Sequence, residues 1–217
     1  MAREQLRELL MQRLSPGAAE WLRGAIASEP REIPRAFSRA ARMIGKTGLD
    51  RGDLVAIGMA DAPCAASDLV RAVLLDRAVS NAGPEGRDTR AIVQQIYDDG
   101  DSSERAAVLR TLGLLPFPEL FLPLAVDACR THVLTVFEAI ACDNVYPARY
   151  FPELAFNQMA LKAAFVELSL SRLRGLDARR TPELDRMARA YAGERTLAGR
   201  SVPPDLSLLM IPERTYS

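Results

Sequence analysis

The stretch SPGAAEWLRGAIASEPREIPRAFSRAARMIG, residues 15–45, indicates the fold class because it holds two complete helix patterns in succession. Ser15 is placed as an N-cap, and Pro16 follows in the first turn, where proline is tolerated. Pro34 opens the second pattern and Gly45 ends it. The apolar residues of the two patterns recur at helical spacing: Trp21, Leu22 and Ile26, then Phe37, Ala41 and Ile44.

The same punctuation continues along the rest of the chain. Caps, prolines and glycines predict the start or the end of six more helices. These are one from Ser67, one through Ile92 and Ile96 to about Gly100, one capped by Asp101, one from Glu119 or Leu122 to Cys142, one from about Pro152 to Leu168, and one from Pro182 to about Gly199. The segment Asp143–Pro152 is predicted to be a loop, and the tail around residues 202–204 to be extended.

These patterns predict an all-α protein without a sheet of three or more strands. Short connections favour antiparallel helical hairpins, and helices of similar length are compatible with HEAT-like stacking. An N-terminal helical layer packed on a C-terminal bundle is the alternative. The sequence shows no clear linker, so residues 1–217 are expected to form a single domain.

Composition excludes several classes of function. The 28 basic and 28 acidic residues balance, so we expect no attraction to nucleic acid by the field of the whole molecule. The N-terminus has no apolar signal core, no run approaches the ~20 apolar residues of a membrane span, and three scattered cysteines fit reduced thiols. A cytoplasmic location follows as the expectation. Residues 172–200 hold eight arginines and four acids, which favours a solvated helix face with internal ion pairs over a phosphate or acidic-partner site.

Common catalytic and metal motifs are incomplete. Gly45-Lys46-Thr47 resembles the end of a phosphate-binding loop, but Ala40 occupies the place of its first glycine and a helix precedes it. His132 is the only histidine, so we expect no zinc site and no cofactor. A packed or partly exposed helical histidine is favoured over a general base.

One segment, FEAIACDNVYPARYFPELAFNQMALKAAF (residues 137–165), places polar side chains inside apolar helices. Residues predicted to share one helical face are Thr131, Thr135, Glu138 and Cys142, and Gln158 and Lys162 share another beside Asn157. The loop between them contributes Asp143, Asn144 and Tyr146, together with Arg149 and Tyr150. Lys162 is one of only two lysines, and it is predicted to meet Glu138 or Asp143 between the helices.

Two interpretations of this segment remain open. Asx turns, aromatic packing and a buried polar network would hold the helix pair together. Alternatively, the helices around residues 127–142 and 152–168 enclose a small polar pocket that binds a ligand. The candidate ligand-binding residues are Glu138, Asp143, Asn144, Tyr146, Asn157, Gln158 and Lys162.

The same segment resembles the EboA-domain family. The resemblance rests on Phe137–Ala141, Tyr146–Ala148, Asn157–Met159 and Leu161–Ala163, and it extends through Gly175-Leu176-Asp177, Glu194-Arg195, Ala198-Gly199-Arg200 and Val202-Pro203. Phe156 replaces a frequent tryptophan, and His132, Gly193 and Thr196 also depart from the family's pattern. The departure at His132 argues against an essential base there.

The resemblance implies a bacterial accessory protein in the trafficking or maturation of secondary metabolites. Family members are encoded with prenyltransferase-like, isomerase-like and metallohydrolase-like proteins, and no catalytic set is assigned to this component. A small-molecule metabolite or a protein of the same gene cluster is therefore the expected partner. The alternatives are an enzyme of unknown reaction that uses Glu138 as acid or base, and a structural adaptor with a helical-repeat surface.

Overall fold

The structure is a computed structural model that describes residues 2–57, 59, 64–80 and 87–212, and every regular element in those ranges is a helix. The predicted all-α class is confirmed for this part of the chain. Backbone contacts divide the chain into two compact units, Met1–Ile140 (unit 1) and Ala141–Ser217 (unit 2). Each unit is described by itself.

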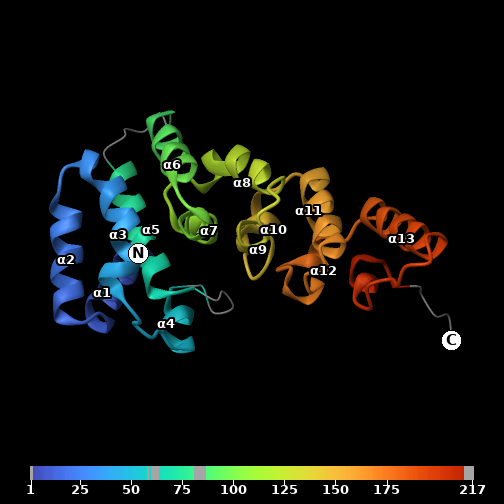
Figure 1. The fold of residues 1–217 in the computed structure, drawn as a ribbon, viewed down its shortest axis with the longest axis horizontal. Coiled ribbons are helices and arrows are strands. Elements are labelled where there is room, and N and C mark those ends of the chain that lie inside the picture. The colour runs from blue at the N-terminus through green and yellow to red at the C-terminus, as the bar shows by residue number, and fades with distance from the viewer. Residues whose placement is uncertain (1, 58, 60–63, 81–86, 213–217) are drawn as a thin grey trace. The chain divides into compact units, whose positions relative to one another are not determined.

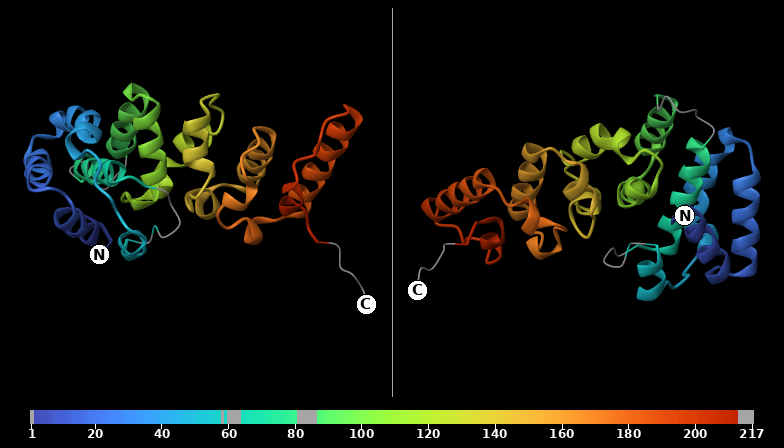
Figure 2. Two further views of the ribbon diagram at one scale, coloured as in Figure 1. Left: turned by 60° about the horizontal axis from the view of Figure 1, so that its bottom comes forward. Right: turned by 180° about the vertical axis from the view of Figure 1, so that it is seen from behind.

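Unit 1 is organised around one buried helix, α5 (Ala66–Val79). The other helices of the unit are α1 (Ala2–Arg13), α2 (Pro16–Ala27), α3 (Ile33–Ile44), α4 (Arg51–Ala56), α6 (Arg87–Asp99), α7 (Ser102–Thr111), α8 (Leu122–Ala128) and α9 (Leu134–Ala141), of which only the last residue belongs to unit 2. Helices α1, α2, α3, α6 and α7 all contact α5, and α1, α2, α3 and α5 lie side by side in Figures 1 and 2. The buried leucines, isoleucines, valines and alanines of α1, α2, α3 and α5 form most of one apolar core cluster.

Two helix starts predicted in unit 1 are confirmed by their capping bonds, whereas the helix predicted from Ser67 begins at Ala66 and has no side-chain cap. The Ser15 hydroxyl accepts a bond from the Ala18 N–H, and the Asp101 carboxylate accepts bonds from the Ser103 and Glu104 N–H groups. Gly45 ends α3 with a φ of 61°, a conformation that suits glycine. The Gly-Lys-Thr sequence is therefore a helix stop.

The predicted long helix ending at Cys142 is wrong. Its region contains a 3₁₀ turn (Pro118–Phe121), α8 and α9, and residues 129–133 between α8 and α9 are not helical. The last turn of α8 is tighter than an α-helix, because its N–H groups donate to carbonyls three residues earlier in the chain. The Arg130 N–H, for example, donates to the Asp127 carbonyl at 2.9 Å. The Thr131 hydroxyl then accepts the Val133 N–H at 3.1 Å, which gives the backbone an alternative to the helix.

The break also corrects the predicted helical face. Thr135 and Glu138 lie in α9, whereas Thr131 precedes this helix and Cys142 follows it. Threonine and valine have modest helix propensity, so residues 131–133 offer little resistance to the turn. The four polar side chains therefore do not form one continuous helical stripe.

The described residues of unit 2, 141–212, contain four α-helices. They are α10 (Tyr146–Tyr150), α11 (Glu153–Phe165), α12 (Leu176–Arg179) and α13 (Pro182–Leu197), with 3₁₀ turns at Leu170–Arg172 and Leu206–Leu209. Helix α11 packs against α13, and the two 3₁₀ turns contact each other. Thr181 caps α13 as predicted, because its hydroxyl accepts the Leu184 N–H at 3.2 Å.

Asp143–Pro152 was predicted to be a loop, but it contains α10. Pro147 stands in the first turn of α10, where its missing N–H costs no helical bond. The Asn144 side-chain oxygen accepts the Tyr146 N–H at 2.9 Å, an Asx turn that leads the chain into this helix. The polar and proline residues that predicted a loop therefore also accommodate a helix of five residues.

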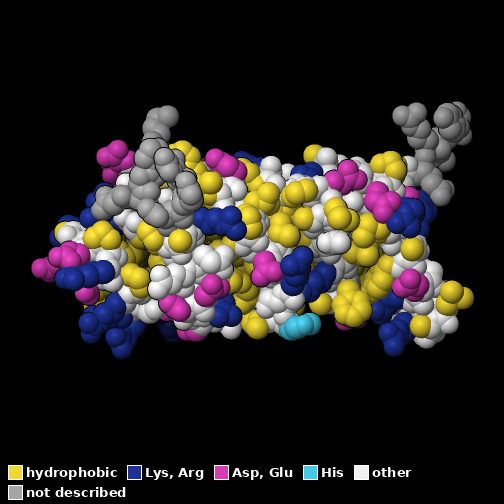
Figure 3. Space-filling view, turned by 90° about the horizontal axis from the view of Figure 1, so that it is seen from above, with side chains coloured by type: hydrophobic (Ala, Val, Ile, Leu, Met, Phe, Trp, Pro, Cys, Tyr) yellow, Lys and Arg dark blue, Asp and Glu magenta, His cyan; other side chains and the backbone are white. Residues whose placement is uncertain are grey.

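The described surface carries mixed charge. On the face seen in Figure 3, acidic and basic side chains are interspersed, and the single histidine lies at the surface. The arginine-rich C-terminal stretch contains the predicted pairs within α13, Arg186 with Glu183 at 2.7 Å and Arg189 with Asp185 at 2.9 Å. Among the helices of the described ranges, none is long and apolar enough to cross a membrane.

Candidate functional site

The Asp143 carboxylate is paired with two arginines in unit 2. Its oxygens accept bonds from Arg172 Nε at 2.7 Å and Arg174 Nη2 at 2.8 Å, while its own N–H donates to the Arg172 carbonyl at 2.8 Å. Asp143 has a φ of 52°, a left-handed conformation that aspartate adopts more readily than most residues. These bonds hold the start of the Asp143–Pro152 segment against the turn that follows α11.

Asn144 and Tyr146 stabilise the same segment from inside. Both are buried, and the Asn144 oxygen is engaged in the Asx turn described above. The Tyr146 ring lies 4.6 Å from that of Tyr150 and 6.3 Å, edge-on, from that of Phe151, measured between centroids. Such contacts fit the structural interpretation of these two residues.

Arg179 fastens α10 to α12, a role that the sequence analysis missed. Its guanidinium donates to the carbonyls of Ala148 at 3.0 Å and Phe151 at 2.7 Å and lies 4.7 Å from the Phe156 ring centroid. Gly175 brings the two helices close, because a Cβ there would lie 2.7 Å from that of Ala148. The signal in the sequence was that Gly175-Leu176-Asp177 belongs to the residues that resemble the EboA-domain family.

Asn157 on α11 differs from the residues of the preceding segment. Its side chain is 1% exposed, and neither its amide nitrogen nor its amide oxygen has a hydrogen-bond partner among the described residues. An unsatisfied buried polar group costs ~1–3 kcal/mol, and such groups are few in native proteins. Helical spacing places Asn157 on one face with Ala160, Leu161 and Ala164.

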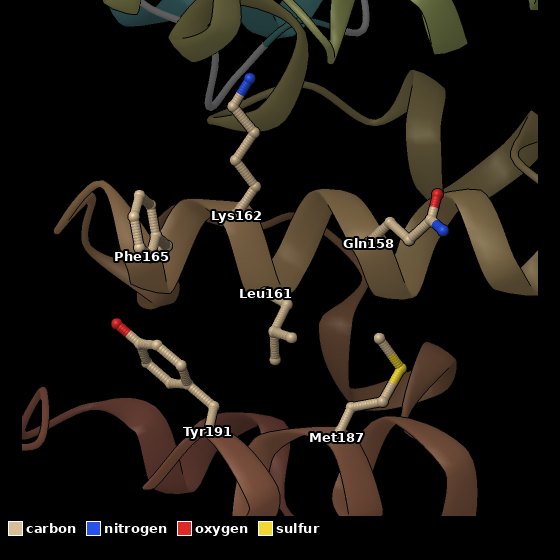
Figure 4. A pocket seen from close by; sticks show the side chains of 6 residues that line it. All are labelled: Gln158, Leu161, Lys162, Phe165, Met187 and Tyr191. Carbon is tan, nitrogen blue, oxygen red and sulfur yellow. The ribbon is translucent and has the colours of Figure 1, made fainter. Parts of the chain in front are cut away.

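Gln158 and Lys162 line an open groove between α11 and α13. The groove has a volume of about 300 Å³, and its other lining residues are Leu161, Phe165, Met187 and Tyr191. Figure 4 shows Leu161 pointing toward α13, while the Lys162 ammonium points away from α13. The groove is therefore apolar at its centre. The Gln158 amide and the aliphatic part of the Lys162 side chain lie at its border.

Glu138 lies on α9 in unit 1 and is half-buried, whereas Lys162 belongs to unit 2 and is also half-buried. Each of the two residues takes part in an interaction within the protein. The predicted pairing of Glu138 with Lys162 stays a prediction.

A second hollow in unit 2 has a volume of about 640 Å³. It is formed by residues that follow α11 and by the end of α13 with its tail: Glu167, Leu168, Ser169, Arg195, Ser201, Val202, Pro203, Pro204 and Asp205. Arg195 donates to the Ser201 carbonyl at 2.6 Å and to the Tyr191 hydroxyl at 3.1 Å. The guanidinium thus fixes the tail to α13 and orders this wall.

Unit 1 contains a buried ionic cluster that the sequence analysis also missed. Arg71 on α5 donates to the Phe37 carbonyl at 3.2 Å and lies 3.9 Å from Asp68 and 3.8 Å from Glu104. Arg110 reaches Asp68 at 3.2 Å. Charged residues within the apolar run of α5 were the available signal.

Cys64 borders the ionic cluster of unit 1, with its Sγ 4.0 Å from an Asp68 oxygen. Burial, and secondarily the Asp68 charge, raise the pKa of the Cys64 thiol well above its usual range. A thiol held in its protonated form is a poor nucleophile. His132 is exposed, and within the described ranges no three His, Cys, Asp or Glu side chains gather as a metal site.

These features define an all-helical protein with concave sites between neighbouring helices. The chain belongs to the EboA family, because the family model described as "Metabolite traffic protein EboA" matches residues 2–210. The match extends over both units and begins far before Phe137, the first residue on which the resemblance rests. Searches of curated proteins and of solved structures gave no significant match.

Proposed function

We propose that the protein is a non-catalytic accessory of a secondary-metabolite trafficking or maturation system, and that α11 provides its ligand-contacting surface. The family description supports a role in metabolite traffic. The single observation that carries the binding role is the buried Asn157 amide, which no described residue satisfies. An unpaired buried amide destabilises the ligand-free protein. A ligand or partner that forms hydrogen bonds with this amide would explain why it is kept.

The proposal narrows the seven candidate residues to three. Asp143, Asn144 and Tyr146 are engaged in holding the Asp143–Pro152 segment. Asn157, Gln158 and Lys162 all stand on α11, and the last two line its groove with α13. The Gln158 amide can both donate and accept hydrogen bonds, and it borders the apolar groove. This combination suits a small molecule with a polar head and an apolar body.

Finer features of the architecture belong to the same proposal. We expect both units to act as one EboA domain in the cytoplasm, since the family match extends over both. Antiparallel hairpins with HEAT-like stacking are the arrangement we propose for the helices. We expect Glu138 to take part in a polar network rather than in acid–base chemistry.

A structural adaptor is the second candidate function. It is favoured by large apolar side chains at the surface, among them Leu154, Phe165 and Leu197, which are 61%, 65% and 91% exposed. Exposed apolar residues that gather in a patch mark protein interfaces. An adaptor would retain a protein partner rather than a small molecule.

Native mass spectrometry of the freshly purified protein tests the proposal. We expect a retained small molecule on the wild type, its loss in Asn157→Leu, and its retention in Gln95→Leu, an exposed amide on α6. A stable protein partner without a small molecule would favour the adaptor. A wild type that retains neither would contradict the binding role of α11.

A further inference from the structure

A groove of about 400 Å³ lies between α2 and α3 in unit 1, remote in sequence from the segment discussed above. Its lining combines the only tryptophan of the chain with two arginines and small residues: Trp21, Gly24, Ala25, Ser28, Glu32, Arg35, Ala36 and Arg39. Grooves with an aromatic wall and a few charged groups are common ligand sites.

The two arginines of the groove have no partner in the part of the chain that the structure describes. Arg35 and Arg39 stand one turn apart on α3, so their side chains are neighbours on one face. Both are exposed, and neither has an ion pair or a hydrogen bond with another described residue. Two like charges at this spacing destabilise a helix slightly, and an anion between them would relieve that repulsion.

Trp21 and Gly24 give the groove a flat apolar wall and an opening. Trp21 is half-exposed on α2, and Gly24 follows it by three residues on the same face. A Cβ added at Gly24 would meet no atom within 4 Å, so the space above this backbone is empty. An aromatic ring in this space can stack on the indole.

We propose that this groove binds a planar aromatic anion, with its ring against Trp21 and its acidic group between Arg35 and Arg39. The guanidinium pair outweighs Glu32, the one carboxylate in the lining, so the charge of the groove favours an anion. This site is separate from the one proposed on α11, and its test does not depend on that proposal. A phosphate ester of an aromatic ring and an aromatic carboxylate both supply the required ring and negative charge.

Fluorescence of Trp21, the sole tryptophan, reports binding directly. The protein is titrated with phenyl phosphate, and separately with benzoate, inorganic phosphate and benzyl alcohol, with calorimetry as a second readout. We expect a saturable response to phenyl phosphate, to benzoate or to both, which distinguishes phosphate from carboxylate ligands. Inorganic phosphate and benzyl alcohol, which each lack one half of the ligand, should bind at least about tenfold more weakly.

Variants locate the response in the groove. Gly24→Leu should fill the space and abolish binding of phenyl phosphate, whereas Gly17→Leu, also on α2 and also facing open space, should leave it unchanged. Arg35→Gln and Arg39→Gln should each weaken binding about tenfold, the equivalent of one charged hydrogen bond. Arg23→Gln, on the opposite face of α2, serves as the charge-matched control.

Three outcomes would overturn the proposal. They are no saturable response to either aromatic anion, equal binding of inorganic phosphate, and binding that survives Gly24→Leu in a protein whose circular dichroism is unchanged.

Discussion

Arg71 on α5 and Asn157 on α11 are both buried, with 3% and 1% of the residue exposed, but only the Arg71 side chain has polar partners. Arg71 has a carbonyl partner and two carboxylates within 4 Å, and its guanidinium lies over the Phe37 ring. The side-chain amide of Asn157 has no hydrogen-bond partner among the described residues. Burial of a polar group therefore does not by itself mark a binding site.

The difference separates two uses of polarity. A charge inside unit 1 is tolerated because opposite charges and a carbonyl surround it, so its removal should harm the fold. An amide left without partners contributes nothing to folding that an apolar side chain could not replace. Variants at the two positions should consequently change stability in opposite directions.

The largest effect is expected for Arg71→Met. This change removes the cation beside the buried Glu104, while Asp68 keeps Arg110 at 3.2 Å, and it should lower the free energy of unfolding by ~3 kcal/mol. Urea denaturation measures the loss, with Arg42→Met on the exposed side of α3 as a control expected within ~0.5 kcal/mol. Equal stabilities of the two variants would show that the cluster contributes little.

A smaller loss is expected for Gly175→Ala. The residue has a φ of 72° and its added Cβ would collide with that of Ala148, so we expect a loss of at least ~2 kcal/mol. Gly193 within α13 faces open space, and Gly193→Ala should instead stabilise by ~0.5–1 kcal/mol. Two losses of similar size would remove the case for a specific contact between α10 and the Gly175 turn.

The predicted Glu138–Lys162 pair should show a moderate coupling. A double-mutant cycle with Glu138→Ala and Lys162→Ala is expected to give a coupling energy of ~1–2 kcal/mol, within the range of residues that interact directly. A coupling near zero would end the polar network proposed for these two residues, while leaving Asn157 unaffected.

Helix ends were predictable where one local bond determines them. Ser15, Asp101 and Thr181 all cap the helices expected from their sequence, because a side-chain oxygen next to a free N–H needs no tertiary information. The break at Thr131 was missed, since apolar periodicity continues across it and only the hydroxyl bond to Val133 reveals the turn.

The candidate site was predictable only as a segment. The sequence placed Asn144 and Asn157 together as polar residues near apolar helices, but one amide directs an Asx turn and the other is unpaired. Which of two asparagines finds a partner depends on the neighbouring backbone, and residue type does not encode that. Arg71 and Arg179 were missed for the same reason, because the carbonyls to which they donate lie 28 to 34 positions away in the sequence.

The stability of Asn157→Leu tests the central claim most directly. If the amide is kept for a ligand or partner, the ligand-free variant should be more stable than ligand-free wild type. We expect its free energy of unfolding, measured by urea denaturation, to be higher by ~1 kcal/mol. Gln158→Leu, an exposed neighbour on α11, should change stability by less than ~0.5 kcal/mol. An Asn157→Leu variant less stable than wild type would contradict the account, because it would mean that the amide contributes to folding.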